Sequence, residues 1–526
     1  MTEAKRSTEP DPAPGFPLRI GVVDMGSNAI RILAAEFLAP YAWTTLVSDR
    51  VPIRLGSSVF ETGEIDEESV EAAVTVMERF RDVLDQFDIR HYRAVATSAV
   101  RESDNRRQLV ALVRKRTGLK LEVISGAEEA RLVYWAAKSR LSLGDEPWIL
   151  ADLGGGSLEI ALVDGNGIRT IESLGIGSVR LLAEFDGEGK TGGPERVRIL
   201  LDEYVAGLRF GDLEDDIEVE GYIATGGNMD ELARLAGADP DENGVSVVPL
   251  EALEEIIEKL AGLTVEERIE QFKLTENRAD VILPAAMVYA RLAKRFGQSR
   301  IHVPHAGVKE GVMIDLVEDL TARAGYTQRH ARDVLSGAVA LGRRYRFEES
   351  HGIHVARLAK RLFEELADMH DLDADDHEIL VAAAVLHDVG QRIGYARHHK
   401  HSYYLISQSE LPGFDAEEIG MVANVARYHR RADPSPKHEP FNALDDPDRD
   451  RVTRMSAILR LADALDREHL QKVTDVSAET RDGRVMLSLE GDGDLELERW
   501  ALDRKKRLFE ETFGLKVTVT SDEERE

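Results

Sequence analysis

Residues 149–163 read ILADLGGGSLEIALV, an apolar strand, a turn of three glycines and a second apolar strand. Residues 18–37 repeat this pattern around the turn Asp24-Met-Gly-Ser-Asn. Asp24 and Asp152 occupy matching positions in the two stretches and are 152 − 24 = 128 residues apart. That distance is too long for a solenoid repeat and suits a duplicated domain. The sequence therefore predicts two similar α/β lobes.

Helical periodicity accounts for the chain between these strands. Residues 67–87 place their apolar side chains on one stripe, and residues 106–117 predict a second helix. Because strands alternate with helices, we expect a largely parallel sheet in each lobe. Lobe I is predicted at residues 18–132 and lobe II at residues 133–318.

The character of the chain changes near Gly325, where strand-like runs give way to apolar residues at helical spacing. We expect an all-α domain over residues 325–470. Residues 471–526 hold strand-like segments around a helix and predict a small α+β tail. Residues 1–17 contain neither an apolar core nor a cleavage site, and predict a disordered leader and not a signal peptide.

The composition narrows the class of protein. The 526 residues carry 67 basic and 97 acidic side chains, and this net charge of −30 predicts no binding to nucleic acid or to a membrane surface. No apolar run approaches the ~18 residues that span a bilayer, and we expect a cytoplasmic protein. The chain has no cysteine, which excludes disulfides, thiolate metal sites and cysteine nucleophiles. A phosphate site must therefore be built locally, from backbone N–H groups, arginines and a divalent cation.

Three glycine turns have the composition of a phosphate cradle. A strand that ends in aspartate and turns through small residues points several backbone N–H groups one way, and its carboxylate can hold a metal ion. Two of the turns are those at Asp24 and Asp152, and the third is Ala224-Thr-Gly-Gly-Asn. Together they resemble the actin-like (ribonuclease H-like) phosphotransferase architecture, in which phosphates lie in the cleft between duplicated lobes. The predicted phosphate-binding residues are Asp24, Gly26, Ser27, Asn28, Gly154, Gly155, Gly156, Ser157, Gly226 and Gly227.

Four further segments narrow the resemblance. They are ATSAVR at 96–101, ISGAEEARL at 124–132, SLGIGSVR at 173–180 and RADVILP at 278–284. Their order and spacing make residues 18–318 similar to the exopolyphosphatase/guanosine pentaphosphate phosphatase family. The resemblance implies a homodimer that binds polyphosphate or guanosine penta- or tetraphosphate. It also implies magnesium-dependent release of a terminal phosphate from polyphosphate or of the 5′-γ-phosphate from pppGpp, and the residues do not choose between these substrates.

The resemblance also assigns roles to single residues. Glu129 matches the family's catalytic carboxylate, which would take a proton from the attacking water, although the adjacent Glu128 leaves a one-residue alternative. Asp152 and Glu159 match positions associated with Mg²⁺. Arg101 would clamp a phosphate through its planar guanidinium, with a surface ion pair as its structural alternative. The chain departs from the family pattern at Ala29, Leu158, Asn228 and His305.

The all-α region carries a second set of candidate ligands. Nine of the 15 histidines lie between residues 351 and 429, and their order with aspartates resembles an HD-type metal-dependent phosphohydrolase domain. Neutral imidazoles and carboxylates suit Mn²⁺, Fe²⁺, Zn²⁺, Ni²⁺ or Mg²⁺. The predicted ligands are His354, His387, Asp388 and Asp463 for one ion, with His401 and His429 available for a second.

Three functions remain open at this stage. The leading hypothesis is a phosphoanhydride hydrolase that works in the cleft between the two actin-like lobes. In the second, the HD-type centre hydrolyses a nucleotide while the actin-like half senses polyphosphate or alarmone. In the third, the protein binds these ligands with little turnover, and the helical domain is only a platform that lengthens the polyphosphate-binding surface.

Overall fold

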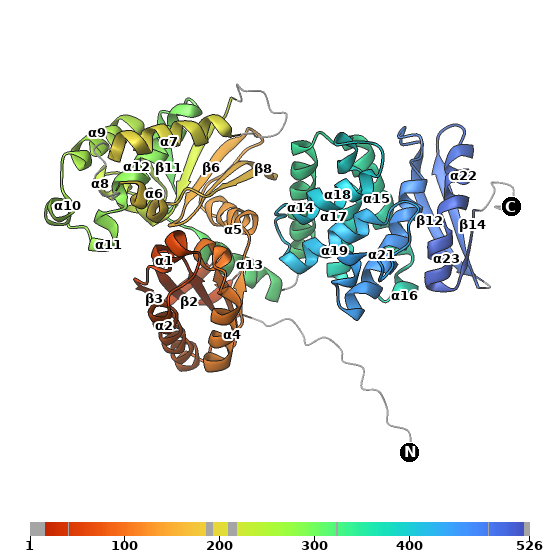
Figure 1. Ribbon diagram of the computed structural model, residues 1–526, viewed down its shortest axis with the longest axis horizontal. Coiled ribbons are helices and arrows are strands. Elements are labelled where there is room, and N and C mark those ends of the chain that lie inside the picture. The colour runs from red at the N-terminus through yellow and green to blue at the C-terminus, as the bar shows by residue number, and fades with distance from the viewer. Residues whose placement is uncertain are drawn as a thin grey trace, which may run out of the picture. The chain divides into compact units, whose positions relative to one another are not determined.

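The computed structural model describes residues 16–39, 42–185, 193–208, 218–321, 324–481 and 483–519. These residues form two compact units, one made chiefly of the chain up to His330 and one chiefly of the chain from Ala331 onward (Figure 1). All but two residues of the leader expected at 1–17 lie outside the described part. Within the described part, no helix has both the length and the apolar character needed to cross a membrane.

Lobe I of the first unit is built on a five-stranded sheet of order β3-β2-β1-β4-β5. Its strands are β1 (Leu18–Met25), β2 (Ile30–Ala39), β3 (Ala42–Val51), β4 (His91–Ala96) and β5 (Leu121–Val123). Its helices are α1 (Leu55–Thr62), α2 (Glu67–Gln86), α3 (Ser98–Glu102), α4 (Arg106–Thr117) and α5 (Gly126–Lys138). The helices predicted at 67–87 and 106–117 are confirmed as α2 and α4.

Lobe II is built on a six-stranded sheet of order β10-β11-β9-β6-β7-β8. Its strands are β6 (Trp148–Leu153), β7 (Leu158–Asp164), β8 (Gly167–Leu174), β9 (Gly221–Thr225), β10 (Ser246–Pro249) and β11 (Arg300–Val303). The helices around it are α6 (Ser178–Phe185), α7 (Gly193–Gly207), α8 (Gly227–Leu235), α9 (Leu250–Ala261), α10 (Val265–Phe272), α11 (Glu276–Ala279) and α12 (Ile282–Arg295). The next helix, α13 (Val308–Leu320), packs against α5 and β1, so it covers the sheet of lobe I.

The prediction of largely parallel sheets is wrong, because each sheet is mixed. The short turns after Asp24 and Asp152 close hairpins, so β1 pairs antiparallel with β2, and β6 pairs antiparallel with β7. Parallel pairing occurs only where a helix intervenes, as between β1 and β4 or between β6 and β9. The two hairpins share one register: Asp24 lies opposite Arg31, and Asp152 lies opposite Glu159. The offset of 128 residues therefore holds for the structure as well.

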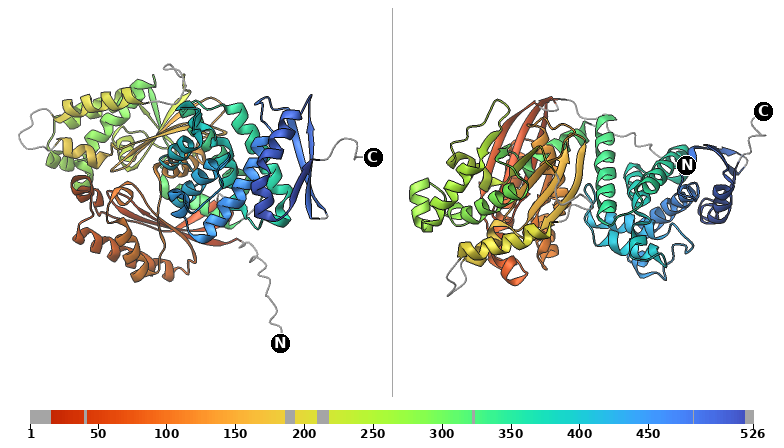
Figure 2. Two further views of the ribbon diagram at one scale, coloured as in Figure 1. Left: turned by 45° about the vertical axis from the view of Figure 1, so that its right-hand side comes forward. Right: turned by 90° about the horizontal axis from the view of Figure 1, so that it is seen from above.

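The second unit is a helical bundle with a small sheet at one end (Figures 1 and 2). Its helices are α14 (Ala324–Arg344), α15 (Glu349–Glu365), α16 (Ala367–His370), α17 (Ala374–Leu386), η1 (Val389–Arg392), α18 (His398–Ser407), α19 (Ala416–Arg427), α20 (Glu439–Asn442) and α21 (Asp446–Ala464). The C-terminal segment adds β12 (Val473–Arg481), β13 (Arg484–Gly491), α22 (Glu496–Lys505), α23 (Arg507–Phe513) and β14 (Lys516–Val519). One continuous apolar core joins the bundle to this segment, since Phe509 and Val473 are buried in the same cluster as Leu386.

Candidate active site and a second candidate metal centre

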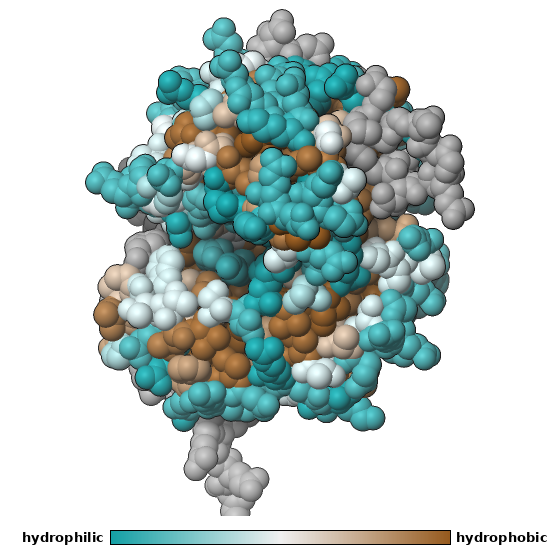
Figure 3. All heavy atoms as spheres, turned by 90° about the vertical axis from the view of Figure 1, so that its left-hand side faces the viewer, coloured by the Kyte–Doolittle hydropathy of each residue, from teal (hydrophilic) through white to brown (hydrophobic). Residues whose placement is uncertain are grey.

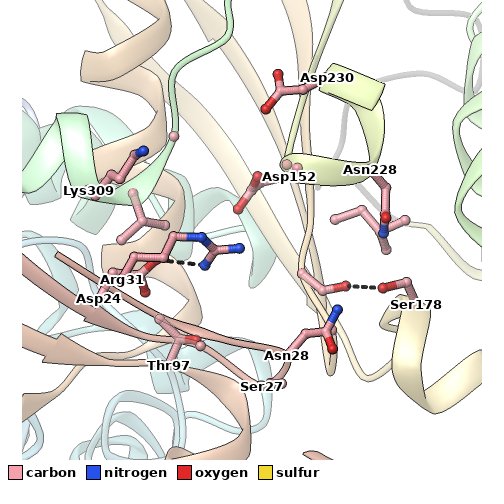
Figure 4. A pocket seen from close by; sticks show the side chains of 18 of the residues that line it. Asp24, Ser27, Asn28, Arg31, Thr97, Asp152, Ser178, Asn228, Asp230 and Lys309 are labelled. Carbon is pink, nitrogen blue, oxygen red and sulfur yellow. Dashed lines mark hydrogen bonds and ion pairs between the residues drawn. The ribbon is translucent and has the colours of Figure 1, made fainter. Parts of the chain in front are cut away.

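The three glycine turns line one cavity between the lobes of the first unit. Asp24 and Ser27 reach it from the end of β1, Asp152 from the end of β6, and Gly226 from the start of α8. Figure 4 shows Asp24 and Asp152 directed toward the same space from different strands. Seen from the left of Figure 1, the hollow between the lobes holds mainly hydrophilic atoms (Figure 3).

Three buried carboxylates converge beside this cavity. Glu129, Asp152 and Glu159 each place an oxygen within 4.8 Å of the others, and they are only 4%, 7% and 1% exposed. Burial raises the pKa of Asp152 to about 6 and that of Glu159 to about 7. Burial, reinforced by the Glu159 charge, also raises the pKa of Glu129 well above its ordinary value. Three acids in one dry site repel each other when ionised, so the cluster favours a cation.

The structure separates the two adjacent glutamates that the sequence left as alternatives. Glu128 is held in a buried ion pair with Arg131 at 2.8 Å, and Arg93 lies 3.3 Å from the same carboxylate. Glu129 instead lines the cavity, in the first turn of α5. The Ser125 side chain caps that helix by accepting a hydrogen bond from the Glu128 N–H at 3.1 Å. The first turn of α5 therefore directs Glu128 into a buried ion pair and Glu129 toward the cavity.

Arg101 lies beside the carboxylates but is not part of the cavity wall. Its Nη1 donates to the carbonyl of Ile124 at 2.8 Å and to Glu129 at 3.3 Å, and its Nη2 lies 3.8 Å from Glu159. These contacts tie the guanidinium to the acid cluster. They place it where it can orient Glu129, and the phosphate clamp that the sequence predicted for Arg101 stays a prediction.

Eight of the ten predicted phosphate-binding residues line the cavity, and two do not. Gly156 faces the protein interior, where a Cβ atom would lie 2.2 Å from the Phe60 ring. Ser157 is buried, and its carbonyl accepts the Gly154 N–H at 3.0 Å, which closes the turn. The residues that line it are Asp24, Gly26, Ser27, Asn28, Gly154, Gly155, Gly226 and Gly227.

Four cations on the cavity wall were given no role by the sequence: Arg31, Arg50, Arg278 and Lys309. Arg31 lies 3.0 Å from Asp24 across the β1–β2 hairpin, and the strand-turn-strand pattern of residues 18–37 is the signal that could have found it. Burial lowers the pKa of Arg50 to about 10, and repulsion from Arg31 and Arg278 adds to this effect. The Arg50 Nε is buried without a hydrogen-bond partner among the described residues. Crowded guanidiniums of this kind are stabilised by an anion.

Of the four positions that depart from the family pattern, Asn228 and His305 line the cavity, and the other two do not. Ala29 and Leu158 are buried in the core. Asn228 accepts a hydrogen bond from Arg278 at 2.8 Å, and His305 contacts Asp230 and Ser246 at 2.9 Å each. None of these residues displaces a carboxylate of the cluster.

The second unit contains a separate cluster of histidines. The Nε2 atoms of His351 and His387 lie 3.2 Å apart, and those of His398 and His429 lie 3.1 Å apart. All four residues are buried. Burial lowers the pKa of His387 and holds that of His429 well below its ordinary value, so these imidazoles are neutral.

The other ring nitrogen of each histidine faces an oxygen. The Nδ1 atoms of His387 and His429 lie 2.7 Å from the carbonyls of Ala384 and Ala426. His351 Nδ1 lies 2.8 Å from an Asp466 oxygen. For His398 the nearest acceptor is the Tyr395 carbonyl at 3.0 Å. For His387 and His429, donation from Nδ1 to a backbone carbonyl leaves the lone pair at Nε2, where it can bind a metal ion.

Two aspartates complete the cluster. Asp388 Oδ1 lies 3.0 Å from His398 and 3.3 Å from His429, and its Oδ2 lies 3.8 Å from His387. Asp463 Oδ1 lies 3.8 Å from His387, while its Oδ2 contacts the Lys505 ammonium. Asp388 thus lies between the two histidine pairs. The geometry offers one group of His351, His387 and Asp463, and another of His398, His429 and Asp388.

Four of the six predicted ligands of this region are brought together, and His354 and His401 are not. His354 lies one helical turn beyond His351 on α15, where its Nδ1 is 3.2 Å from Arg357. His401 lies one turn beyond His398 on α18. Residues three apart share a helix face, so apolar periodicity did not distinguish them. His351 and His398 take the places that the sequence gave to His354 and His401.

The fold of the first unit and its cavity define a two-lobed, actin-like phosphatase. The sequence model of the Ppx/GppA phosphatase family matches residues 38–320, and the model of Ppx/GppA phosphatase domain III matches residues 335–506. The chain belongs to the Ppx/GppA phosphatase family, whose enzymes generally depend on divalent metal ions.

Individual relatives match more than half of this chain along most of their own length. An uncharacterized protein of Streptomyces coelicolor is 30% identical over 309 residues, which are 57% of this chain and 91% of that protein. Exopolyphosphatase 1 of Mycobacterium leprae is 26% identical over 326 residues, 60% of this chain and 94% of the relative. The crystal structure of an exopolyphosphatase from Cytophaga hutchinsonii superposes with a TM-score of 0.53 at 27% identity, covering 57% of this chain and 98% of its own.

Proposed function

We propose that the cavity between the lobes releases a terminal phosphate from inorganic polyphosphate or from the 5′ end of pppGpp. The observation that carries this proposal is the convergence of Glu129, Asp152 and Glu159 beside a cavity walled by glycine turns and four cations. The backbone N–H groups of the turns and the guanidiniums would hold the phosphate chain. The three acids would lie at the terminal phosphate, where they would activate water and hold a metal ion.

Glu129 would accept the proton of the attacking water. Burial favours its protonated form, so it binds a proton more strongly than an exposed glutamate. The charge of Arg101, at 3.3 Å, opposes this rise in the pKa of Glu129. The pair would thus set the proton affinity of the base and hold its carboxylate in place.

The acid cluster fits Mg²⁺. Its donors are all carboxylate oxygens, and the buried Glu159 Oε2 has no hydrogen-bond partner among the described residues. Asp152 and Glu159 would hold the ion, and Thr225 Oγ1 orients Asp152 by donating to its Oδ1 at 2.6 Å. A bound Mg²⁺ would neutralise charge on the transferred phosphoryl group.

Phosphate release from polyphosphate, pppGpp and ATP, measured with purified protein with and without Mg²⁺, tests this proposal. We expect release from polyphosphate or pppGpp that chelation abolishes and that Glu129→Gln removes. Release that is equal in the parent protein and in Glu129→Gln would contradict the assignment of the cavity.

A second function is favoured by the paired Nε2 atoms of the second unit. We propose that His351, His387 and Asp463 hold one divalent ion and that His398, His429 and Asp388 hold another, in an HD-type phosphohydrolase centre. Imidazole nitrogen with carboxylate oxygen suits Mn²⁺, Fe²⁺, Ni²⁺ or Zn²⁺, and Mg²⁺ less well. Metal analysis of protein dialysed free of loosely bound ions tests this. We expect up to two Mn²⁺, Fe²⁺, Ni²⁺ or Zn²⁺ ions per chain, and none of these metals in a variant that combines His387→Ala with Asp388→Ala.

A further inference from the structure

A cavity of about 540 Å³ opens beside the histidine cluster of the second unit. This size lies within the range of ~300–1,000 Å³ that small-molecule sites occupy. Asp388, His398, His429 and Asp463 form part of its wall, so a ligand in this cavity would reach the proposed metal ions.

The remaining wall is strongly cationic, in a chain whose net charge is −30. Some of these cations are already neutralised, since Arg460 and Arg507 both contact Asp433. Others have no carboxylate partner among the described residues, namely Arg431, Arg467 and Arg504. Unpaired guanidiniums gathered around one cavity are suited to bind phosphate. The basic residues of the wall are Arg430, Arg431, Arg460, Arg467, Arg504, Lys505 and Arg507.

Two aromatic side chains also line this cavity. Trp500 on α22 is 53% exposed, and Tyr395, just after η1, is 65% exposed. The Arg504 guanidinium lies 4.8 Å from the centre of a Trp500 ring, and that of Arg430 lies 5.6 Å from the Tyr395 ring. An exposed ring beside a guanidinium can stack on a flat base while the cation binds the attached phosphate. A linear polyphosphate chain would make no use of these rings.

The C-terminal segment supplies one side of the cavity through Trp500, Arg504, Lys505 and Arg507. Lys505 also contacts Asp463 Oδ2 and leaves Asp463 Oδ1 toward His387. The segment therefore both orients a proposed metal ligand and presents the groups that a ligand would meet.

We propose that this cavity binds a nucleotide, with its phosphate toward the histidine cluster and Arg504 and its base on Trp500. The proposal rests on the second function proposed above and adds the residues that would recognise the base and the phosphate. It also gives the C-terminal segment a role in recognition. Stacking on the Trp500 ring would favour a nucleotide over phosphate compounds that lack a base.

Isothermal titration of the full-length protein, loaded with Mn²⁺, with adenosine 5′-monophosphate and with ribose 5-phosphate tests the proposal. We expect the nucleotide to bind at least about tenfold more tightly, because stacking on one aromatic ring contributes that much to affinity. Trp500→Ala should remove this advantage. Arg504→Glu should weaken both ligands about tenfold or more.

Two variants on the same helix serve as matched controls. Leu497→Ala and Arg499→Glu make comparable changes at residues that do not line the cavity, and they should leave both affinities unchanged. Equal affinities for the two ligands, or no effect of Trp500→Ala and Arg504→Glu, would overturn the proposal. Bound metal is measured in the same samples. Metal without base-dependent binding contradicts this inference alone, whereas absence of metal contradicts the second proposed function.

Discussion

The two clusters of candidate ligands differ in their donors and in how the chain builds them. The cleft of the first unit uses carboxylates alone, contributed by two paired strands and the start of α5. The cluster of the second unit uses four imidazoles and two carboxylates, contributed by helices and the turns after them. Oxygen donors favour a hard ion such as Mg²⁺, while imidazoles favour borderline metals. One chain thus offers two sites that different metals should occupy.

The two clusters should also respond to pH in opposite ways. Burial raises the pKa values in the carboxylate cluster, so its acids ionise only toward neutral pH and the cleft should gain a working base as pH rises. Burial lowers the pKa of His387 and His429, so these ligands stay neutral well into the acid range. These two ligands should therefore remain able to bind metal at pH values where the acids of the cleft are already protonated.

The largest expected effect is on the cleft. Glu129→Gln keeps the shape of the side chain but removes its ability to accept a proton, and should lower turnover by ~10²–10⁴-fold. Steady-state phosphate release from polyphosphate and pppGpp measures this. Metal bound to the second unit should be unchanged in the same variant. Glu128→Gln is not a suitable control, because Glu128 pairs with Arg131. Glu64→Gln, at an exposed position, serves instead.

The next effect compares neighbouring histidines. His351→Ala should weaken metal binding in the second unit by more than ~100-fold, since loss of a residue that merely orients a ligand costs ~10–100-fold. His354→Ala, one turn along the same helix, should leave the bound metal unchanged. The pair His398→Ala and His401→Ala makes the same comparison on α18. Equal loss of metal in both variants of a pair would contradict the ligand geometry described above, because the residue predicted from helical periodicity would then matter as much as its neighbour.

These outcomes reflect what a sequence can and cannot specify. The turns at Asp24 and Asp152 are local features, and six of their eight predicted phosphate-binding residues line one cavity together with Gly226 and Gly227. Arg50 and Arg278 come from distant segments, and only the folded sheet brings them to the same wall. On a helix, apolar periodicity predicts which face is buried. It does not predict which of two residues one turn apart on that face binds the metal. This is why His354 and His401 were predicted in place of His351 and His398.

A smaller effect distinguishes two roles for Arg101. Lysine keeps the charge but has a single nitrogen, so Arg101→Lys cannot contact Ile124, Glu129 and Glu159 together. If Arg101 orients Glu129, kcat should fall about tenfold with little change in KM, and the acid limb of the pH profile should move to higher pH as the pKa of Glu129 rises. A rise in KM at constant kcat would instead restore the phosphate clamp. Arg106→Lys, at an exposed site nearby, is the control.

The smallest effect concerns stability. Burial raises the pKa of Glu159 to about 7 from an ordinary 4.5, so the folded state pays for its ionisation as pH rises between these values. Glutamine resembles the protonated form and can still accept the Ser173 hydrogen bond. Glu159→Gln should therefore match the parent protein at pH 4.5 and exceed its Tm at pH 8, by about 2–4 °C for each kcal/mol relieved.

Calorimetry in the presence of a chelator measures this difference in Tm, and Mg²⁺ should reduce it by stabilising only the parent protein. The parallel experiment on the second unit has the opposite sign. His429→Gln removes no buried charge, because the imidazole is already neutral, and so should bring no gain in Tm at any pH. An equal gain in Tm for Glu159→Gln and His429→Gln would contradict this difference. It would mean that His429, like Glu159, carries a buried charge in the folded protein.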